Sequence, residues 1–401
     1  MDQASPGSPS SAVDGSVFLA RTRALAPMLA GAADQIEERR ELPASIVSAL
    51  IENGLFRLLQ PHFLGGVQLD PMAFVEVIEE VAKHDASTAW CLCQGNGCSM
   101  ISAFLEPKVA QEIFGPADGI VAWGPAGRAE LHAVPGGYRL TGRWSFATGS
   151  HHATWLGAHV PVLAADGTQL RRPDGGEVLR TLLFPKTNVK MTDIWRVVGL
   201  RGTGSDAFSA EDLFVPESHT VLRGPESQPR QPGRLYAFSS GNLYAAGFAG
   251  VALGTARGTL DAFIALARDK VPQGSRRALR ESQVVQSQVA QAEARLGSAR
   301  MFLLSSLGEI WEAVGWNGEV TLAQNARIRL ASTWAIQQAR EVVTTLYHAA
   351  GATAIFDDNP FERRFRDMHT AAQQAQGRPA HFETVGRILL GLEPDATMFT
   401  F

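Results

Sequence analysis

The spacing of apolar residues changes twice along the chain and divides it into three blocks. From residue 17 to 114, and again from about residue 242 onward, apolar residues recur every three to four positions, as on one face of an amphipathic helix. Between Ile120 and Pro216 the pattern becomes short alternating runs broken by Gly, Pro and Asp, which is typical of strands. Helices and strands segregated in this way predict an α+β fold rather than an alternating α/β sheet.

These changes predict the domain boundaries. We expect a disordered N-terminus over residues 1–15, which are rich in Ser, Ala, Gly and Pro. An N-terminal helical domain over 16–118, a middle β-barrel-like domain over 119–232 and a C-terminal four-helix bundle over 233–401 follow. The expected helices cover Phe18–Arg39, Pro43–Gly54, a stretch from Asp70, Ala86–Phe104, Asn242–Lys270, Ser275–Trp311, Thr321–Ala350 and a shorter one from about Pro360 to Leu392.

The middle block is expected to be antiparallel. Gly136-Gly137 lies between two alternating runs and predicts a tight hairpin turn. The expected strands are Glu130–Val134, Tyr138–Thr141, Trp155–Pro161, Arg180–Phe184 and Ala207–Val215.

Composition excludes several classes of protein. The 401 residues are 45% hydrophobic and carry a formal net charge of −4, which argues against a general nucleic-acid binder. No apolar run approaches the roughly 20 residues of a membrane span. Three clustered cysteines, Cys91, Cys93 and Cys98, are a poor disulfide framework and indicate a reducing cytoplasm.

Two motifs leave alternatives open. Gly202 to Ala207 fits the dinucleotide-binding pattern G-x-G-x-x-A, but a strand rather than a helix is expected after it, so we interpret it as a Gly-rich β-turn. Trp144 to His152 places an aromatic residue, a hydroxyl and a glycine at a strand end. This arrangement suits a flat cofactor, and it equally suits an ordinary turn. Arg366-Asp367 is most simply an ion pair at an interface.

Several segments together are similar to the acyl-CoA dehydrogenase-like flavoproteins. Glu41-Leu42-Pro43 through Leu59, with Gly65-Gly66, resembles the opening of that family. Gly199 to Ser205 with Phe214-Val215-Pro216 resembles its middle-domain signature, and Arg363 to Asp367 with Gly386 to Gly391 resembles its C-terminal helix. The resemblance covers nearly everything after Phe18.

Within this family the chain resembles the flavin-dependent, two-component (group D type) monooxygenases more than the dehydrogenases. Dehydrogenases need a carboxylate base, and the positions where the family carries it hold Ala375 and Tyr244 here. The arginine-phenylalanine-glycine motif that holds the adenine half of FAD is also missing near Lys270–Gly274.

The resemblance implies roles for particular residues. Phe146 would stack on the flavin, and Thr148 would hydrogen-bond near its N5 and help to hold a C4a-hydroperoxide. Cys98 and Gln374 stand where many hydroxylases carry histidines, which favours a substrate nucleophile other than a phenol. The further implied cofactor contacts are Gly149, Arg201, Thr203, Ser205 and Arg366, and the implied pocket residues are Trp90, Gln94, Tyr244 and His369.

The leading hypothesis is therefore a monooxygenase that receives reduced FMN or FAD from a separate flavin reductase and oxygenates a small organic substrate. An acyl-CoA dehydrogenase or oxidase with tightly bound FAD and an atypical base is the main alternative, and a non-catalytic ligand-binding scaffold is the third. The resemblance also implies a homotetramer.

Overall fold

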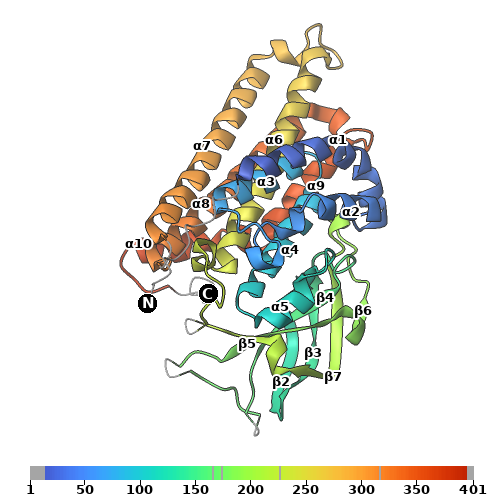
Figure 1. Cartoon of the computed structure of the whole chain (residues 1–401). Helices are drawn as coiled ribbons and strands as arrows, with labels where there is room; N and C mark the ends of the chain where they lie inside the picture. Colours follow the sequence, from blue (N-terminus) through green and yellow to red (C-terminus); the bar gives the residue numbers. More distant parts are fainter. Residues whose placement is uncertain (1–13, 165–166, 173–174, 225–226, 316–317, 395–401) are drawn as a thin grey trace, which may run out of the picture.

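Helices pack along one side of a smaller β-rich part in the computed structural model, which describes residues 14–164, 167–172, 175–224, 227–315 and 318–394 (Figure 1). Most of the segment expected to be disordered lies outside these residues. Asp14 and Gly15 depart from that expectation, because the Asp14 carboxylate accepts a hydrogen bond from Ser16 N at 2.9 Å and caps the first helix.

The first part of the chain forms five α-helices. Asp70 caps the third and Asp85 the fourth, each accepting a hydrogen bond from the backbone N–H three residues later. The helices are α1 (Gly15–Arg39), α2 (Ala44–Glu52), α3 (Pro71–Ala82), α4 (Ala86–Ser99) and α5 (Pro107–Phe114).

The β-rich part consists of two four-stranded sheets, with the orders β1-β4-β5-β8 and β2-β3-β7-β6. The tight hairpin between β2 and β3 forms as expected, but its two turn residues are Pro135 and Gly136, because Gly137 already pairs with Val134 as the first residue of β3. One pairing corrects the antiparallel prediction, because β1 runs parallel to β4 after β2 and β3 have passed through the other sheet. The strands are β1 (Val121–Trp123), β2 (Ala126–Val134), β3 (Gly137–Ala147), β4 (Trp155–Pro161), β5 (Leu179–Pro185), β6 (Lys190–Thr192), β7 (Asp206–Pro216) and β8 (Thr220–Arg223).

The last part of the chain is helical again. The final predicted helix is divided by a short 3₁₀ turn at Ala375–Gly377, and Pro379 then opens the next helix. The helices are α6 (Ser240–Asp269), α7 (Gln283–Val314), α8 (Leu322–Ala350), α9 (Phe361–Gln373) and α10 (Ala380–Leu389). None of the helices in the described ranges combines the length and apolar character that a membrane span requires.

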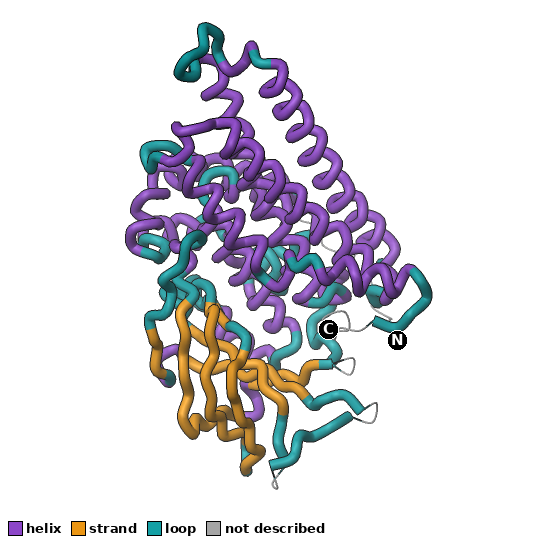
Figure 2. The backbone as a smooth tube through the Cα atoms, turned by 180° about the vertical axis from the view of Figure 1, so that it is seen from behind, coloured by secondary structure: helices purple, strands orange, loops and turns teal. Residues whose placement is uncertain are grey.

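Helix α6 forms the centre of the core. It packs against α3 and α4 on one side and α8 on the other, so that almost its whole N-terminal half is buried. Seen from behind, the strands gather at one end of the helices (Figure 2), and the chain passes between the two parts after α5 and again before α6. The candidate site lies near the place where α4, which also contacts β1, packs against α6 and α9.

Candidate functional site

The end of β3 presents an exposed aromatic ring on a strained backbone. Phe146 has a φ of 59° and a side chain that is 58% exposed. A bulky residue rarely adopts this left-handed conformation, and such strain gathers at functional sites. The Trp195 ring meets it edge-on, with 5.8 Å between ring centroids. Residues 148–152 then form a turn rather than further strand.

Three buried hydroxyls form a chain next to this strand end. The Thr203 hydroxyl donates to the Leu200 carbonyl at 2.9 Å, and the Ser205 hydroxyl lies 2.8 Å from both Thr203 Oγ1 and Thr148 Oγ1. Because each hydroxyl has a single proton, Ser205 must donate to Thr203 and Thr148 must donate to Ser205. The Thr148 oxygen is therefore left with acceptor capacity only.

This arrangement changes the expected roles of two residues. Thr203 and Ser205 are almost completely buried, so each could influence a cofactor only through Thr148. The Gly149 N–H donates to the Thr203 carbonyl at 3.0 Å and fixes the turn that carries Thr148. Direct contact of Gly149 with a cofactor stays a prediction.

A buried carboxylate holds the turn that supports the hydroxyl chain. Asp367 Oδ1 accepts a hydrogen bond from Leu200 N at 2.6 Å, and Leu200 itself has a φ of 52°. The Leu200 carbonyl accepts hydrogen bonds from both Thr203 and Trp195 Nε1. Burial raises the pKa of Asp367 to about 7. Asp367 thus positions both the hydroxyl chain and the indole that contacts Phe146.

The two arginines expected near a cofactor pair with acids of the same chain. An ion pair between Arg366 and its neighbour Asp367 was expected. Arg366 instead forms ion pairs with Glu37 and Glu362, each at 2.7 Å. Its charge is thus balanced where α1 and α9 meet. Arg201 shares Glu37 at 3.3 Å, and its side chain is 42% exposed. Both arginines support the turn, and direct contact with a cofactor stays a prediction.

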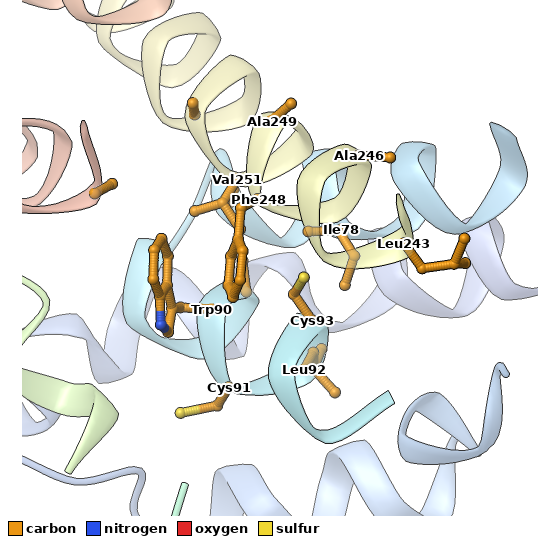
Figure 3. Packing of buried hydrophobic residues seen from close by; sticks show 14 of the residues in the cluster. Ile78, Trp90, Cys91, Leu92, Cys93, Leu243, Ala246, Phe248, Ala249 and Val251 are labelled. Carbon is orange, nitrogen blue, oxygen red and sulfur yellow. The ribbon is translucent and has the colours of Figure 1, made fainter. Parts of the chain in front are cut away.

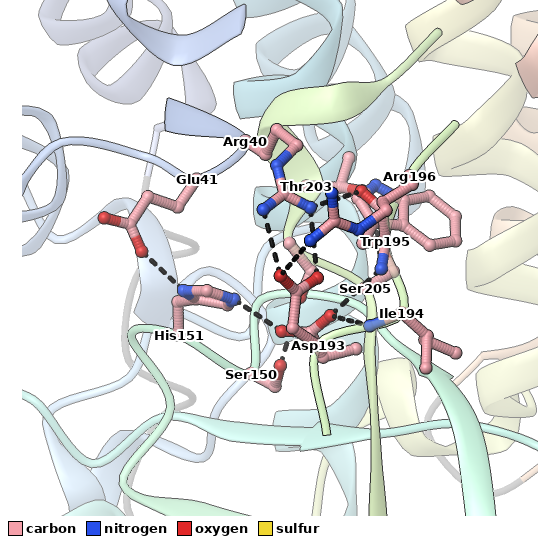
Figure 4. A network of polar contacts seen from close by, with 12 residues as sticks. Arg40, Glu41, Ser150, His151, Asp193, Ile194, Trp195, Arg196, Thr203 and Ser205 are labelled. Atoms are coloured by element: carbon pink, nitrogen blue, oxygen red, sulfur yellow. Dashed lines mark hydrogen bonds and ion pairs between the residues drawn. The ribbon is translucent and has the colours of Figure 1, made fainter. Parts of the chain in front are cut away.

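A second buried carboxylate, that of Asp206, which the sequence analysis did not single out, anchors the same region, and its partners His151, Ile194 and Trp195 are labelled in Figure 4. Asp206 Oδ1 accepts hydrogen bonds from Ile194 N and Trp195 N at 3.0 and 3.2 Å. Asp206 Oδ2 lies 2.8 Å from His151 Nε2, and the other ring nitrogen of His151 contacts Glu41. The position of Asp206, directly after the Gly-rich turn, was the available signal in the sequence.

Helices α4 and α6 bring four of the expected pocket and catalytic residues together. Gln94 Nε2 donates to the Tyr244 hydroxyl at 3.2 Å, and Cys98 Sγ lies 3.3 Å from the same hydroxyl. The Tyr244 ring stacks on Phe248. Phe248 in turn stacks on Trp90 with 4.0 Å between ring centroids (Figure 3). We call Trp90, Gln94, Cys98, Tyr244 and Phe248 the α4/α6 cluster.

The polar members of the α4/α6 cluster are neutral near pH 7. Burial raises the pKa of the Cys98 thiol to about 12, against the hydrogen bond from Tyr244, and burial raises the pKa of Tyr244 well above its ordinary value. These groups can donate and accept hydrogen bonds, but neither is an anionic base at this pH.

The remaining expected residues lie on or just after α9. His369 Nε2 lies 3.1 Å from the Thr344 hydroxyl of α8, and its ring lies 4.3 Å from that of Phe365. Gln374 ends α9 and its side chain accepts a hydrogen bond from Gln376 N. In the described part of the chain neither residue shares a hydrogen bond or a ring contact with the α4/α6 cluster, and their assigned roles stay predictions.

A cavity of about 660 Å³ opens beside the α4/α6 cluster. Its wall includes Gly97, where an added Cβ would lie only 2.2 Å from Tyr244 Cε1. Trp123 forms another part of the wall, and the next residue, Gly124, packs against the backbone of Phe146. Among the described lining residues, only Glu319 is acidic, and it is exposed. Its apolar and aromatic lining includes Met100, Ile101, Phe104, Trp123, Tyr236 and Phe238.

The side chains around Phe146 fit a reduced flavin. A flat ring system needs an aromatic surface, which the exposed Phe146 offers, and reduced flavin carries an N–H donor at N5 that needs an acceptor. Thr148 supplies an acceptor that has no proton left to donate. Phe146 and Thr148 are therefore the residues that would hold the ring.

Comparison with known proteins agrees with this geometry. Acyl-CoA dehydrogenase, N-terminal domain, matches residues 20–116, and acyl-CoA dehydrogenase, C-terminal domain, matches residues 246–379. The chain is 30% identical over 363 residues to the indole-3-acetate monooxygenase of Pseudomonas putida, covering 90% of each protein. It is 27% identical over 370 residues to the flavin-dependent monooxygenase oxygenase subunit HsaA of Rhodococcus jostii, covering 90% of this chain and 94% of that one.

A solved structure extends the similarity to three dimensions. The crystal structure of 3-HSA hydroxylase from Rhodococcus sp. RHA1 matches with a TM-score of 0.87 and 26% identity, over 95% of this chain and 98% of that one. The alternative of an acyl-CoA dehydrogenase is not supported, because these relatives are oxygenases and the expected base positions hold Tyr244 and Ala375. The chain therefore belongs to the acyl-CoA dehydrogenase superfamily and, within it, to the branch of flavin-dependent monooxygenase oxygenase components, as its sequence predicted.

Proposed function

We propose that this chain takes reduced FMN or FAD from a separate flavin reductase and uses O₂ to oxygenate a small aromatic substrate. One oxygen atom enters a C–H bond of the substrate and the other leaves as water, while the reduced flavin gives up two electrons and two protons. The proposed substrate class follows from the aromatic lining of the cavity and from a relative that is named for indole-3-acetate.

The observation that carries this proposal is the direction of the hydrogen bonds at Thr148. When bound, reduced flavin supplies the two electrons that activate O₂. The chain of hydroxyls leaves Thr148 able to accept a hydrogen bond from a ring N–H and unable to donate one outward. Thr148 would thus favour the reduced, N5-protonated form of the ring over the oxidised form.

The cavity would orient the substrate and exclude water. Its aromatic and aliphatic wall offers a surface for a flat, apolar molecule. The neighbouring Tyr244, Cys98 and Gln94 are uncharged hydrogen-bonding groups at physiological pH. They suit the positioning of a polar substituent better than removal of a proton from carbon.

The test loads the protein anaerobically with reduced FMN, and separately with reduced FAD, and then mixes it with O₂ and a candidate aromatic substrate. We expect flavin oxidation in at least two absorbance phases, against a single phase for free flavin, and one ¹⁸O atom from ¹⁸O₂ in each product molecule. Single-phase oxidation to hydrogen peroxide with every substrate would contradict the proposal. Bleaching of oxidised flavin by an acyl-CoA would support the dehydrogenase alternative.

Two matched variants test the role of Thr148. Thr148→Val removes the acceptor and leaves Ser205 without its donor, so the yield of oxygenated product per flavin oxidised should fall by about tenfold or more, the loss expected for one hydrogen bond to a charged or reacting group. Thr148→Ser keeps the hydroxyl and should retain most of the yield. Equal yields from the Val and Ser variants would remove Thr148 from the mechanism.

We also propose a homotetramer and a cytoplasmic location. Large apolar side chains remain exposed on α7 and at the end of α10, among them Met301 at 61%, Leu389 at 74% and the following residue Leu390 at 80%, which suits burial against further copies of the chain. Light scattering should give a mass four times the 43.1 kDa of one chain. The three cysteines are free and buried in the monomer, which suits a reducing compartment.

A further inference from the structure

One arginine in the wall of the cavity has a charge that none of the residues described by the structure balances. Arg223 is the last residue of β8, and it lines the cavity that is described above. It makes no hydrogen bond or ion pair through its side chain with any residue that the structure describes, and burial lowers its pKa. Arg223 is partly buried, and a guanidinium that loses part of its hydration without gaining a partner is costly, which points to a ligand of opposite charge.

The polar groups beside Arg223 do not compensate for this charge. His159 also lines the cavity, and its Nδ1 lies 2.8 Å from the Thr181 hydroxyl. Burial, followed by the charge of Arg223, holds the pKa of His159 well below its ordinary value, so the imidazole is neutral at pH 7. Tyr244, whose ionised form would interact with Arg223, stays a neutral phenol. Among the described residues that line the cavity, the one positive charge at pH 7 therefore belongs to Arg223.

The rest of the cavity defines the shape of the ligand. The Trp123 ring lies edge-on to His159, with 4.7 Å between centroids, and Met100, Ile101 and Phe104 line the wall formed by the end of α4 and the turn after it. The wall thus combines one cation with a mostly apolar, partly aromatic surface. Through Trp123 and Gly124 it continues to the backbone of Phe146, the residue assigned to the flavin ring.

We propose that Arg223 binds the carboxylate of an aromatic acid whose ring lies against Trp123 and the end of α4, and that this acid is the substrate. The identification of this acid as the substrate rests on the proposed function, but its binding to Arg223 does not depend on turnover. A planar guanidinium and a carboxylate form two parallel hydrogen bonds, which fix both the distance and the orientation of the acid.

The charge in the wall favours a carboxylate over a phosphate. A phosphate monoester carries nearly two negative charges at pH 7 and three acceptor oxygens, and its sites usually gather several cationic or N–H donors. The cavity supplies one cation and, at its exposed rim, the acidic Glu319. A monoanion with two oxygens is the better match for this set.

The experiment measures binding anaerobically, with the full chain and reduced FMN, so that no turnover takes place. The probes are indole-3-acetate, phenylacetate and benzoate, each paired with its uncharged amide, and the readouts are equilibrium dialysis and quenching of tryptophan fluorescence. For at least one pair the acid should bind about tenfold or more tightly than the amide, as expected for a charge-assisted hydrogen-bond pair.

Variants assign this preference to one side chain. Arg223→Gln should abolish the preference by weakening the acid about tenfold while changing the amide less than about twofold, and Arg223→Lys should restore part of it. Arg128→Gln is the matched control, because it changes the net charge by the same amount as Arg223→Gln. Arg128 is an exposed arginine of β2 that already contacts Glu130. This variant should leave both ligands unaffected.

The outcomes separate this inference from the proposed function. Equal binding of acid and amide in every pair, absence of binding in every pair, or a preference that survives Arg223→Gln would overturn it. Should that variant fail to fold, the acid–amide comparison on the unaltered protein and on Arg223→Lys still decides. Tight, Arg223-dependent binding of an acid that is never oxygenated would instead count against the monooxygenase proposal alone.

Discussion

Asp367 links the pH dependence of stability to the geometry of the candidate flavin site. Its carboxylate is buried and accepts a 2.6 Å hydrogen bond from Leu200 N, which holds the turn under the hydroxyl chain. The perturbation is Asp367→Asn, which keeps an oxygen acceptor for Leu200 and removes the ionisable group. Asp367→Ala, which removes the acceptor as well, serves as the comparison.

The size of the effect follows from the shift in pKa. Burial, helped by the negative charges of Asp85 and Glu37 and opposed by the Leu200 hydrogen bond and Arg366, raises the pKa of Asp367 from 3.8 to about 7 in the folded protein. The folded state then holds a proton that the unfolded chain has released, so stability is lost as the pH rises from about 4 to 7. At about 1.4 kcal/mol per pKa unit, roughly 2–3 kcal/mol of this loss falls between pH 5 and pH 8.

The assay is urea denaturation of the wild type and both variants at intervals from pH 5 to pH 8. From pH 5 to pH 8 the free energy of unfolding should decrease in both proteins. The decrease in Asp367→Asn should be smaller than that in the wild type by about 2–3 kcal/mol. Asp367→Ala should lose the same pH dependence and also about 1–3 kcal/mol at every pH, because Leu200 N is left buried without an acceptor. Identical pH slopes for the wild type and Asp367→Asn would show that ionisation of Asp367 does not cause the pH dependence of stability.

Two further substitutions test the packing around α4. Gly97→Ala would place a Cβ 2.2 Å from Tyr244 Cε1, so the Tyr244 side chain must move away from Gln94 and Cys98. We expect substrate binding, measured by titration, to be about tenfold weaker. Gly97→Ser adds the same Cβ and should bind no more tightly than Gly97→Ala. Asn96 accepts a hydrogen bond from Leu58 N and donates to the carbonyls of Leu55 and Leu92, all buried. Asn96→Ala should therefore lower the free energy of unfolding by about 2–4 kcal/mol, whereas a loss below about 0.5 kcal/mol would contradict this account.

Much of the fold could be predicted from the spacing of apolar residues and from local signals. Asp70 before Pro71 marked the start of α3, and Gly136-Gly137 marked the β2–β3 hairpin, because caps and tight turns depend on neighbouring residues. The parallel pairing of β1 with β4 could not be predicted in this way. It joins strands that are separated by an entire hairpin of the other sheet.

For the candidate site, too, some features could be predicted from the sequence and others depend on contacts between distant residues. The sequence by itself determined the family and the type of chemistry, and it pointed to Phe146 and Thr148 as an aromatic residue and a hydroxyl at a strand end. The sequence could not determine that Thr148 is a hydrogen-bond acceptor. That property depends on Ser205, 57 residues away, and on the hydrogen bond from the Thr203 hydroxyl to the Leu200 carbonyl.

The tertiary structure alone decided which charges are balanced. Arg366 and Arg223 look alike in the sequence, yet Arg366 meets Glu37 from the other end of the chain, whereas Arg223 faces a cavity with no acid on its inner wall among the described residues. Local patterns fix secondary structure through interactions between near neighbours. The protonation, pairing and exposure of a side chain depend on groups that only the folded chain brings within a few ångströms.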